Sequence, residues 1–140
     1  MKKSIANPET GDWAEHETAY SDGVCVHKPG YKRVFVSGIV GDGDGIAEQT
    51  RSALESIQDL MAQFGGEMQD IVRVRIYVNK SHLSDESLEK IHTIRREFFL
   101  KEQYPASTLV EVEGLVKENF LIEIDADGII PDGEWDVETV

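Results

Sequence analysis

The sequence predicts an α+β domain in which two helices pack on one face of a single β-sheet. The 140 residues are the size of one domain, so residues 1–140 are expected to fold as one unit. Two stretches place apolar residues at helical spacing, and five shorter stretches have the composition or the alternation of strands. Along the chain these stretches follow the order β-β-α-β-α-β-β.

The N-terminal half is expected to form a hairpin and then a helix. Residues 1–19 are polar and are expected to be an irregular extension, with Trp13 as a candidate anchor. Strands are expected at residues 24–27 and 33–38, because a Pro-Gly turn separates two Val-rich runs. A helix is expected over residues 46–64, where apolar side chains recur at helical spacing until a Gly-Gly pair stops it.

The C-terminal half is expected to contain the other three strands and the second helix. Residues 71–78 alternate between apolar and polar side chains, which is typical of a half-buried strand. Ser84 is a good N-cap for a helix that continues to about Leu100. Trp135 is a candidate to pack back onto the fold. The two remaining strands are expected at residues 108–113 and 121–125, and residues 131–140 are expected to be an acidic, loose tail.

The alternation divides the strand residues between two faces of the sheet. The face expected beneath the helices consists of Val34, Val36, Val72, Val74, Ile76, Val110, Val112, Ile122 and Ile124. The opposite face is expected to carry Phe35, Ser37, Arg73, Arg75, Tyr77, Ser107, Leu109, Glu111, Glu113, Leu121, Glu123 and Asp125. A solvated face is one explanation of this second set. Its mixture of aromatic, aliphatic and charged side chains favours the other, an interface with further copies of the same chain.

Composition excludes several classes of function. The chain has 14 Lys plus Arg against 27 Asp plus Glu, a formal net charge of −13 that repels nucleic-acid phosphates, so no nucleic-acid partner is expected. The excess acidity serves solubility or, alternatively, adaptation to a salt-rich cytoplasm. No apolar run is long enough for a membrane span, and no signal peptide follows the basic start. With one cysteine and hence no internal disulfide, a cytoplasmic location is expected.

The sequence lacks the patterns of the common metal and dinucleotide sites, so neither a metal nor a dinucleotide is expected. The four histidines have neither HExxH nor other paired spacing. The run Asp42-Gly43-Asp44-Gly45 lacks the further ligands of a calcium-binding loop and is interpreted as a turn. There is no GxGxxG run for a dinucleotide, and Cys25 is interpreted as a buried structural thiol.

Several motifs in register resemble the Rid proteins, the reactive intermediate deaminases that are also called the YjgF family. The resemblance spans Tyr20 to Ile130 and implies a homotrimer of the chorismate-mutase-like fold, with ligand clefts between neighbouring subunits. It also implies hydrolysis of small enamines and imines to a carbonyl compound and ammonia without a cofactor. The motifs are Tyr20-Ser21-Asp22-Gly23-Val24, Val34-Phe35-Val36-Ser37-Gly38, Gln49-Thr50-Arg51-Ser52-Ala53-Leu54, Phe98-Phe99, Pro105-Ala106, Val110-Glu111-Val112 and Ile122-Glu123-Ile124.

The resemblance assigns candidate roles to individual residues. Glu123 matches the cleft glutamate, which could orient the attacking water and accept its proton. Tyr20 matches the tyrosine at the mouth of the pocket, Ser37 and Gly38 match a strand-end pair that contacts the ligand, and His92 falls near a helix position that faces the cleft. Each also has a plain structural explanation, as an interface charge, a tight strand end or a packed side chain.

One departure from the family pattern concerns substrate binding. The deaminase pattern is Pro-Ala-Arg-Ser, in which the arginine binds the substrate carboxylate as a bidentate fork. Here the run is Pro105-Ala106-Ser107-Thr108, so Ser107 replaces the arginine and, with Thr108, becomes a candidate ligand contact. A hydroxyl donates one hydrogen bond but supplies no charge. Arg73 or Arg75, on the same expected sheet face, is a candidate replacement.

Three functions remain open from the sequence. The leading hypothesis is a Rid-type hydrolase whose substrate either lacks an acid group or has it bound differently. The alternative is a trimeric small-molecule binder or sensor that uses the same cleft without turnover. An endoribonuclease is the third, and the negative charge of the chain makes it the weakest.

Overall fold

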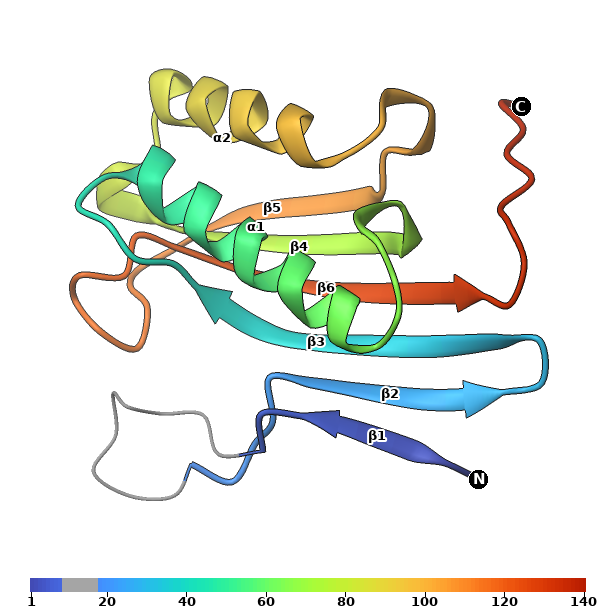
Figure 1. The fold of residues 1–140 in the computed structure, drawn as a ribbon. Helices are drawn as coiled ribbons and strands as arrows, with labels where there is room; N and C mark the ends of the chain where they lie inside the picture. The colour runs from blue at the N-terminus through green and yellow to red at the C-terminus, as the bar shows by residue number, and fades with distance from the viewer. Residues whose placement is uncertain (9–17) are drawn as a thin grey trace.

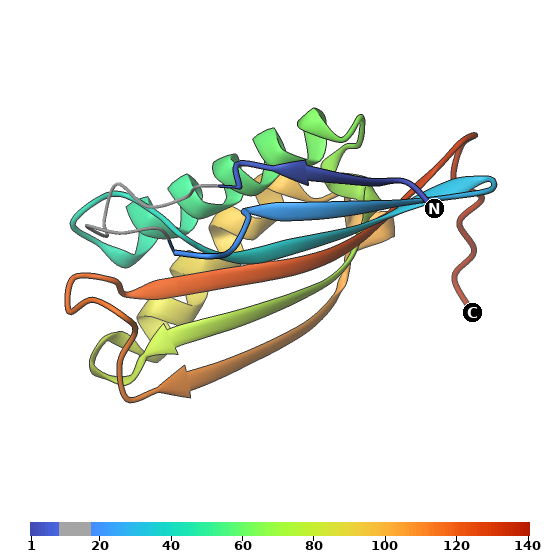
Figure 2. The same cartoon turned by 90° about the horizontal axis from the view of Figure 1, so that it is seen from below.

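Six strands form one mixed sheet, and both α-helices lie on the same face of it (Figures 1 and 2). The computed structural model describes residues 1–8 and 18–140. The helices are α1 (Ile46–Gln63) and α2 (Asp85–Phe98). The strands are β1 (Lys3–Ala6), β2 (Gly23–Lys28), β3 (Tyr31–Val40), β4 (Ile71–Asn79), β5 (Ala106–Val112) and β6 (Ile122–Pro131).

The order of strands across the sheet is β1-β2-β3-β6-β4-β5. All neighbouring pairs are antiparallel except β4 and β5, which are parallel and are joined by the α2 crossover. The α+β architecture with two helices on one face, predicted from the sequence, is confirmed. Among the described residues, no helix has both the length and the apolarity needed to cross a bilayer.

The first strand differs from the prediction of an irregular N-terminal extension. Lys3–Ala6 pairs antiparallel with β2, where Ile5 lies opposite Val24, and Ala6 is buried. A four-residue edge strand with so few apolar residues carries little periodicity, so only its pairing partner makes it a strand. Trp13, the candidate anchor, lies outside the described residues.

The helices form where the sequence predicted them. Helix α1 buries Ala53, Ile57 and Leu60 against the sheet, in keeping with its apolar spacing. Helix α2 begins after Ser84, as predicted, in a capping box. The Ser84 hydroxyl accepts a 3.1 Å hydrogen bond from the Ser87 amide, and the Ser87 hydroxyl accepts a 2.7 Å bond from the Ser84 amide.

Strand β4 contains an irregularity that corrects one predicted face. The pairing of β4 with β6 shifts register between Ile71 and Arg73. Ile71 therefore enters the core at 2% exposure, whereas Val72, predicted beneath the helices, is 38% exposed. A β-bulge breaks the strict alternation on which the prediction relied.

Strand β5 presents the opposite faces from those predicted. Its parallel register places Ser107 beside Val74 of the core, so Ser107 and Leu109 face the helices and Leu109 packs on the core. Val110 is 43% exposed on the other face. By the same alternation, Glu111 is on the face with the helices and Val112 is on the open face. The predicted face was wrong because β5 is an edge strand, whose apolar residues do not all point inward.

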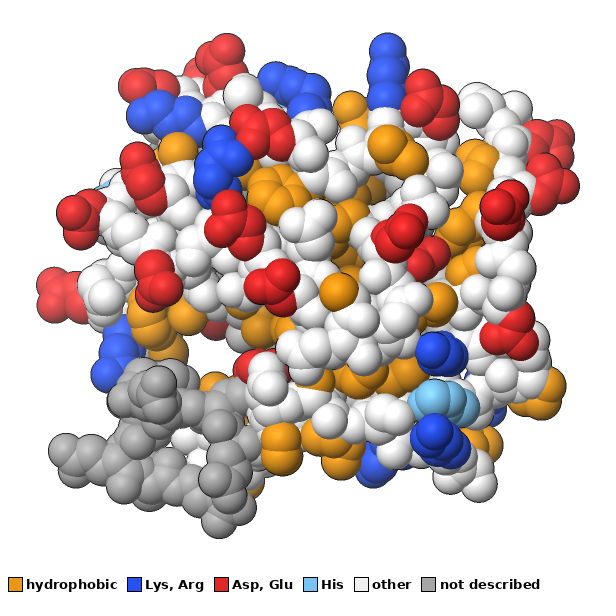
Figure 3. Space-filling model, in the orientation of Figure 1, with side chains coloured by type: hydrophobic (Ala, Val, Ile, Leu, Met, Phe, Trp, Pro, Cys, Tyr) orange, Lys and Arg blue, Asp and Glu red, His pale blue; other side chains and the backbone are white. Residues whose placement is uncertain are grey.

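Two further segments pack onto the fold. Leu121, predicted on the open face, is buried instead, and its backbone N–H donates a 2.9 Å hydrogen bond to the Gln49 side chain of α1. Trp135 packs back from the C-terminal tail, as the sequence suggested, and its indole N–H donates a 2.7 Å bond to Asp70. Figure 3 shows acidic side chains spread over the helix-covered side of the molecule.

Candidate active site

The Glu123 carboxylate lies against the backbone of β3 at Gly38. Strands β3 and β6 pair with a register shift between Val36 and Ile39, so Ser37 and Gly38 form an irregular segment beside β6. A methyl group on Gly38 would overlap the carboxylate of Glu123. The absence of a side chain at residue 38 therefore creates the space that the carboxylate occupies.

The environment of Glu123 favours its protonated form more than water does. Burial raises the pKa of the Glu123 carboxyl, and the negative charge of Asp125 raises it further. Within residues 1–8 and 18–140, no hydrogen bond to the Glu123 side chain is formed. A half-buried carboxylate with a raised pKa and unoccupied oxygens is suited to accept a proton from water.

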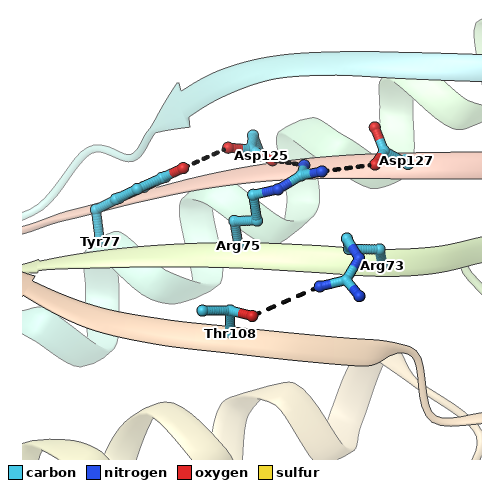
Figure 4. Close-up of polar contacts among 6 residues, drawn as sticks. All are labelled: Arg73, Arg75, Tyr77, Thr108, Asp125 and Asp127. Atoms are coloured by element: carbon cyan, nitrogen blue, oxygen red, sulfur yellow. Dashed lines mark hydrogen bonds and ion pairs between the residues drawn. The ribbon is translucent and has the colours of Figure 1, made fainter.

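A network of ionic contacts lies on the open face of the sheet (Figure 4). It includes Tyr77, which is paired with Glu123 in the register of β4 and β6. Arg75 of β4 reaches across to β6 and binds Asp125 at 2.6 Å and Asp127 at 2.9 Å. The Tyr77 hydroxyl donates a 3.1 Å hydrogen bond to the second oxygen of Asp125. The hydrogen bonds that Arg75 donates to Asp125 and Asp127 raise the pKa of Arg75. The guanidinium is therefore held by two carboxylates of its own chain.

The other arginine considered as a replacement for the family's substrate-binding residue is also on this face. Arg73 lies 3.5 Å from the Thr108 hydroxyl, at the limit of a hydrogen bond (Figure 4). Thr108 and Ser107 are consecutive in β5, so their side chains point to opposite faces of the sheet. Neither Arg73 nor Arg75 lines the pocket in which Ser107 lies.

Tyr20 and Gly38 line a pocket of about 370 Å³ together with Leu60 of α1. The segment that carries Tyr20 is fixed by Ser37, whose hydroxyl donates a 2.5 Å hydrogen bond to the carbonyl of Ser21. The hydroxyl of Ser37 therefore has a structural partner in this chain. Of the predicted pair, Ser37 therefore holds the segment next to Tyr20, and Gly38 leaves space for the Glu123 carboxylate.

A second pocket, of about 480 Å³, lies between α2 and β5. We call it the basic pocket and define it by His92, Arg95, Arg96 and Ser107. Partial desolvation lowers the pKa of His92, and the positive charges of Arg95 and Arg96 lower it further. The remaining lining is largely apolar and consists of Phe99, Tyr104, Pro105 and Leu109.

Comparison with known proteins places this geometry in a family. The family described as Endoribonuclease L-PSP matches residues 12–130 of the chain. The chain belongs to this family. A solved structure of Rv2704 from Mycobacterium tuberculosis, a member of the YjgF/YER057c/UK114 family, is 30% identical, has a TM-score of 0.76, and covers 92% of this chain and 100% of its own. The resemblance to the YjgF or Rid proteins noted from the sequence is confirmed.

Two other relatives extend the comparison. A YjgF family protein from Neisseria meningitidis, NMB1025, shares the fold with a TM-score of 0.74 and 21% identity, covering 95% of this chain and 98% of its own. A RutC family protein from Pyrococcus abyssi is 34% identical over 90 residues, which are 64% of this chain. The chain therefore spans 65% of that curated relative.

In this family member the predicted site residues fall into two groups within one chain. Glu123, Gly38 and Tyr20 lie around β3 and β6, whereas His92 and Ser107 lie in the basic pocket. Strands β6 and β4 lie between β3 and β5. The distance from β3 to β5 is therefore roughly 14 Å, at about 4.8 Å between neighbouring strands. Ser107 also faces the helices, whereas Glu123 faces the open side beside Tyr77.

Sequence reasoning missed both arginines of this family member's basic pocket, Arg95 and Arg96. Arg95 follows His92 by three positions in α2, so the two side chains share one helix face. That spacing was the available signal for Arg95. For metals, no group of three or more His, Cys, Asp or Glu side chains converges in the described part of the chain. Cys25 is buried, and burial raises the pKa of its thiol.

Proposed function

We propose that the protein is a Rid-type hydrolase that converts small imines or enamines into a carbonyl compound and ammonia. The observation that carries the proposal is the Glu123 carboxylate, which is half-buried and has a raised pKa. It lies against Gly38 and forms no hydrogen bond within the described chain. A base of this kind is what the attack of water on a C=N carbon requires.

The reaction follows from that placement. Glu123 accepts a proton from water as the water oxygen bonds to the imine carbon, and the electron pair of the C=N bond moves to nitrogen. The protonated carboxyl then returns the proton to the nitrogen of the tetrahedral intermediate. Glu123 then accepts the proton of the hydroxyl group and passes it to nitrogen as the C–N bond breaks, so that ammonia leaves and the carbonyl forms. An enamine first takes up a proton at carbon and loses one from nitrogen, which gives the imine. The raised pKa of Glu123 suits both directions of transfer.

The proposal includes a homotrimer with the reacting clefts between subunits. Two observations support it besides the family resemblance. The open face of the sheet exposes Ile5, Phe35 and Val110 next to the ionic network of Arg75. The candidate site residues His92 and Ser107 also lie on the other face of the chain from Glu123, so a cleft that contains all three would need a neighbouring copy.

A coupled assay tests the hydrolase. An amino-acid oxidase generates imines, and semicarbazide traps those that survive, so active protein slows semicarbazone formation. Glu123→Gln is expected to abolish this effect while the trimer persists. The matched control is Glu118→Gln, which removes a carboxylate from an exposed loop and should retain activity. Full activity of Glu123→Gln would reject the proposed mechanism.

The second candidate is a binder or sensor without turnover, which the serine at position 107 favours because it removes the family's arginine. No acceleration with any imine, together with a ligand bound in the cleft, would support it. The family description also raises RNA cleavage. Cleavage that survived repurification and disappeared in Glu123→Gln would support that function against the net charge of −13.

A further inference from the structure

We infer that Asp125 is a positioning residue for the proposed reaction, because its fixed negative charge makes Glu123 a stronger base. Arg75 and Tyr77 hold the Asp125 carboxylate in place on the open face of the sheet. The inference rests on the proposed function and deepens it by naming a group that acts through Glu123 without touching the substrate. The observation that carries it is a contrast between two carboxylates on one strand face. One is held at both oxygens, and the other forms no hydrogen bond within the described chain.

Glu123 and Asp125 lie on the same face of β6. One core residue, Ile124, separates them in the sequence, and both carboxylates are partly buried, in keeping with the alternation of the strand. Alternate residues of a strand are about 7 Å apart, which is within the range over which two charges interact at physiological salt. The backbone of β6 alone therefore places a second carboxylate close enough to act on the base.

Donors from β4 occupy both oxygens of Asp125 (Figure 4). Arg75 lies opposite Asp125 in the register and donates to its Oδ1 at 2.6 Å. The Tyr77 hydroxyl donates to its Oδ2 at 3.1 Å. With both oxygens engaged, the charge of Asp125 stays at a fixed position. Glu123, whose oxygens accept no hydrogen bond in the described chain, is the carboxylate that can exchange a proton with water.

Strand β4 places a neutral residue, Tyr77, opposite Glu123. The guanidinium of Arg75 binds both Asp125 and Asp127, at 2.6 Å and 2.9 Å. One cation compensates only part of the charge of two carboxylates, so a net negative charge remains near Glu123. In keeping with this, the pKa of the Glu123 carboxyl is raised, by burial first and by the charge of Asp125 second.

The segments on the other side of Glu123 add no positive charge within the described chain. In β3, residues 36–40 contain no titratable side chain. Gly38 also lines the pocket of about 370 Å³, to which Tyr20 and Asp22 belong, and the lining of this pocket contains no Lys, Arg or His. Glu123 therefore has a carboxylate neighbour but no cation of its own, and it holds a proton more tightly than it would in water. Enzymes use such pairs of carboxylates in unlike environments to prepare one of them for proton transfer.

Direct titration of Glu123 tests the inference without any turnover. We would label the full-length protein with ¹³C at the glutamate side-chain carboxyl and follow the signals with pH, identifying Glu123 by the signal lost in Glu123→Gln. Asp125→Asn removes the charge and keeps the shape, so Glu123 is expected to ionise at lower pH than in the wild type. Arg75→Gln removes the compensating cation, so Glu123 is expected to ionise at higher pH. Arg75→Lys keeps a cation and should titrate close to the wild type.

The pH profile of imine hydrolysis gives a second readout. In Asp125→Asn the base ionises more readily and is weaker, so the rate is expected to rise about threefold on the acidic limb and to fall about twofold on the plateau. In Arg75→Gln the rate should fall about threefold to tenfold on the acidic limb. Ratios to the wild type at each pH cancel the pH dependence of the imine and of the trapping reaction. A merely structural role of Asp125 would lower the rate by one factor at every pH.

Two variants serve as matched controls. Asp127→Asn makes the same change on the same strand face and next to the same guanidinium, but about twice as far along β6 from Glu123, so its effect should be smaller. Arg33→Gln removes a cation from β3, roughly 20 Å along the strand from Val40, which pairs with Glu123. Salt screens charges over that distance, so the titration of Glu123 should not move.

An unchanged titration of Glu123 in folded Asp125→Asn would overturn the inference. An effect of Asp127→Asn as large as that of Asp125→Asn would also overturn it. If Asp125→Asn does not fold, ionisation of Glu123 at higher pH in Arg75→Gln supports the inference, and an unchanged titration there overturns it.

The two proposals fail separately. A titration of Glu123 that depends on Asp125, without hydrolysis of any imine, would contradict the proposed function and leave the action of Asp125 on Glu123 standing. Imine hydrolysis together with a titration of Glu123 that does not depend on Asp125 would support the proposed function and contradict this inference.

Discussion

The carboxylate of Glu123 in β6 occupies the space that a side chain on Gly38 in β3 would fill. The two residues come from strands that are paired antiparallel, with a register shift at Ser37 and Gly38. The carboxylate forms no hydrogen bond within the described residues, and its place depends on the space left at Gly38. The position of the proposed base, Glu123 of β6, therefore depends on Gly38, a residue of a different strand.

Gly38→Ala is expected to reduce imine hydrolysis about tenfold to a hundredfold with little loss of stability. The new methyl group displaces the flexible end of Glu123 rather than backbone, and misplacement of a catalytic group by about 1 Å can cost roughly a hundredfold in rate. Turnover and thermal unfolding of the same preparation check this. Gly114→Ala is the control, since nothing lies near Gly114. Wild-type turnover in Gly38→Ala would contradict the role of this contact.

Glu123→Gln is expected to raise the melting temperature slightly at neutral pH. The folded-state pKa of Glu123 is raised above its value in the unfolded chain, so the folded state loses stability as pH rises from about 4.3 through the raised pKa. The amide does not ionise and escapes this loss. Melting curves from pH 3.5 to 7.5 should show the gain only at the higher pH values. A uniform difference at all pH values would indicate another cause.

Arg75→Gln is expected to lower the melting temperature, and more so at low salt. The change leaves Asp125 and Asp127 without their shared cation, and the repulsion between them is screened by added salt. Melting temperatures at about 20 mM and 500 mM NaCl measure the difference, at ionic strengths on either side of the physiological range. Lys101→Gln, an exposed charge outside the network, should show little effect at either concentration.

Trp135→Phe is expected to destabilise the fold by about 1 kcal/mol, because Asp70 loses the indole N–H that it accepts at 2.7 Å. Asp70→Ala should cost more, since the second oxygen of Asp70 also accepts a 2.8 Å bond from the Glu67 amide. Urea unfolding gives both values. Val137→Ala, in the same exposed tail, is the control. Equal stabilities of Trp135→Phe and the wild type would show that the tail contact is not formed in solution.

The mass in solution tests the proposed assembly. Light scattering is expected to give about three times the chain mass of 15.7 kDa. Phe35→Lys should dissociate the particle, because it places a charge on the open face, opposite Asp127 of the same sheet. Val116→Lys, on an exposed loop, should leave the mass unchanged. A wild-type mass of one chain would remove the intersubunit cleft.

Much of the local structure was predictable because it depends on neighbours in the chain. The apolar stripe of α1 and the Ser84 cap of α2 lie in segments whose periodicity and end signals agree. Glu123 and Ser107 could be named as candidate site residues because they fall within short ordered motifs. The strand Lys3–Ala6 could not, since it forms by pairing with β2, a strand that is distant in the sequence.

The sequence by itself determined the helices, most strands, the family and the residue that replaces the family's arginine. The tertiary structure decided which residues share a surface. The bulge at Val72 and the parallel register of β5 set the faces of the sheet, and only the packing of α2 against β5 brings Arg95 to Ser107. The physical reason is that the spacing of apolar residues shows which residues share a face of one helix or strand. Which of these faces meet is set by the packing and pairing of helices and strands that are distant in the sequence.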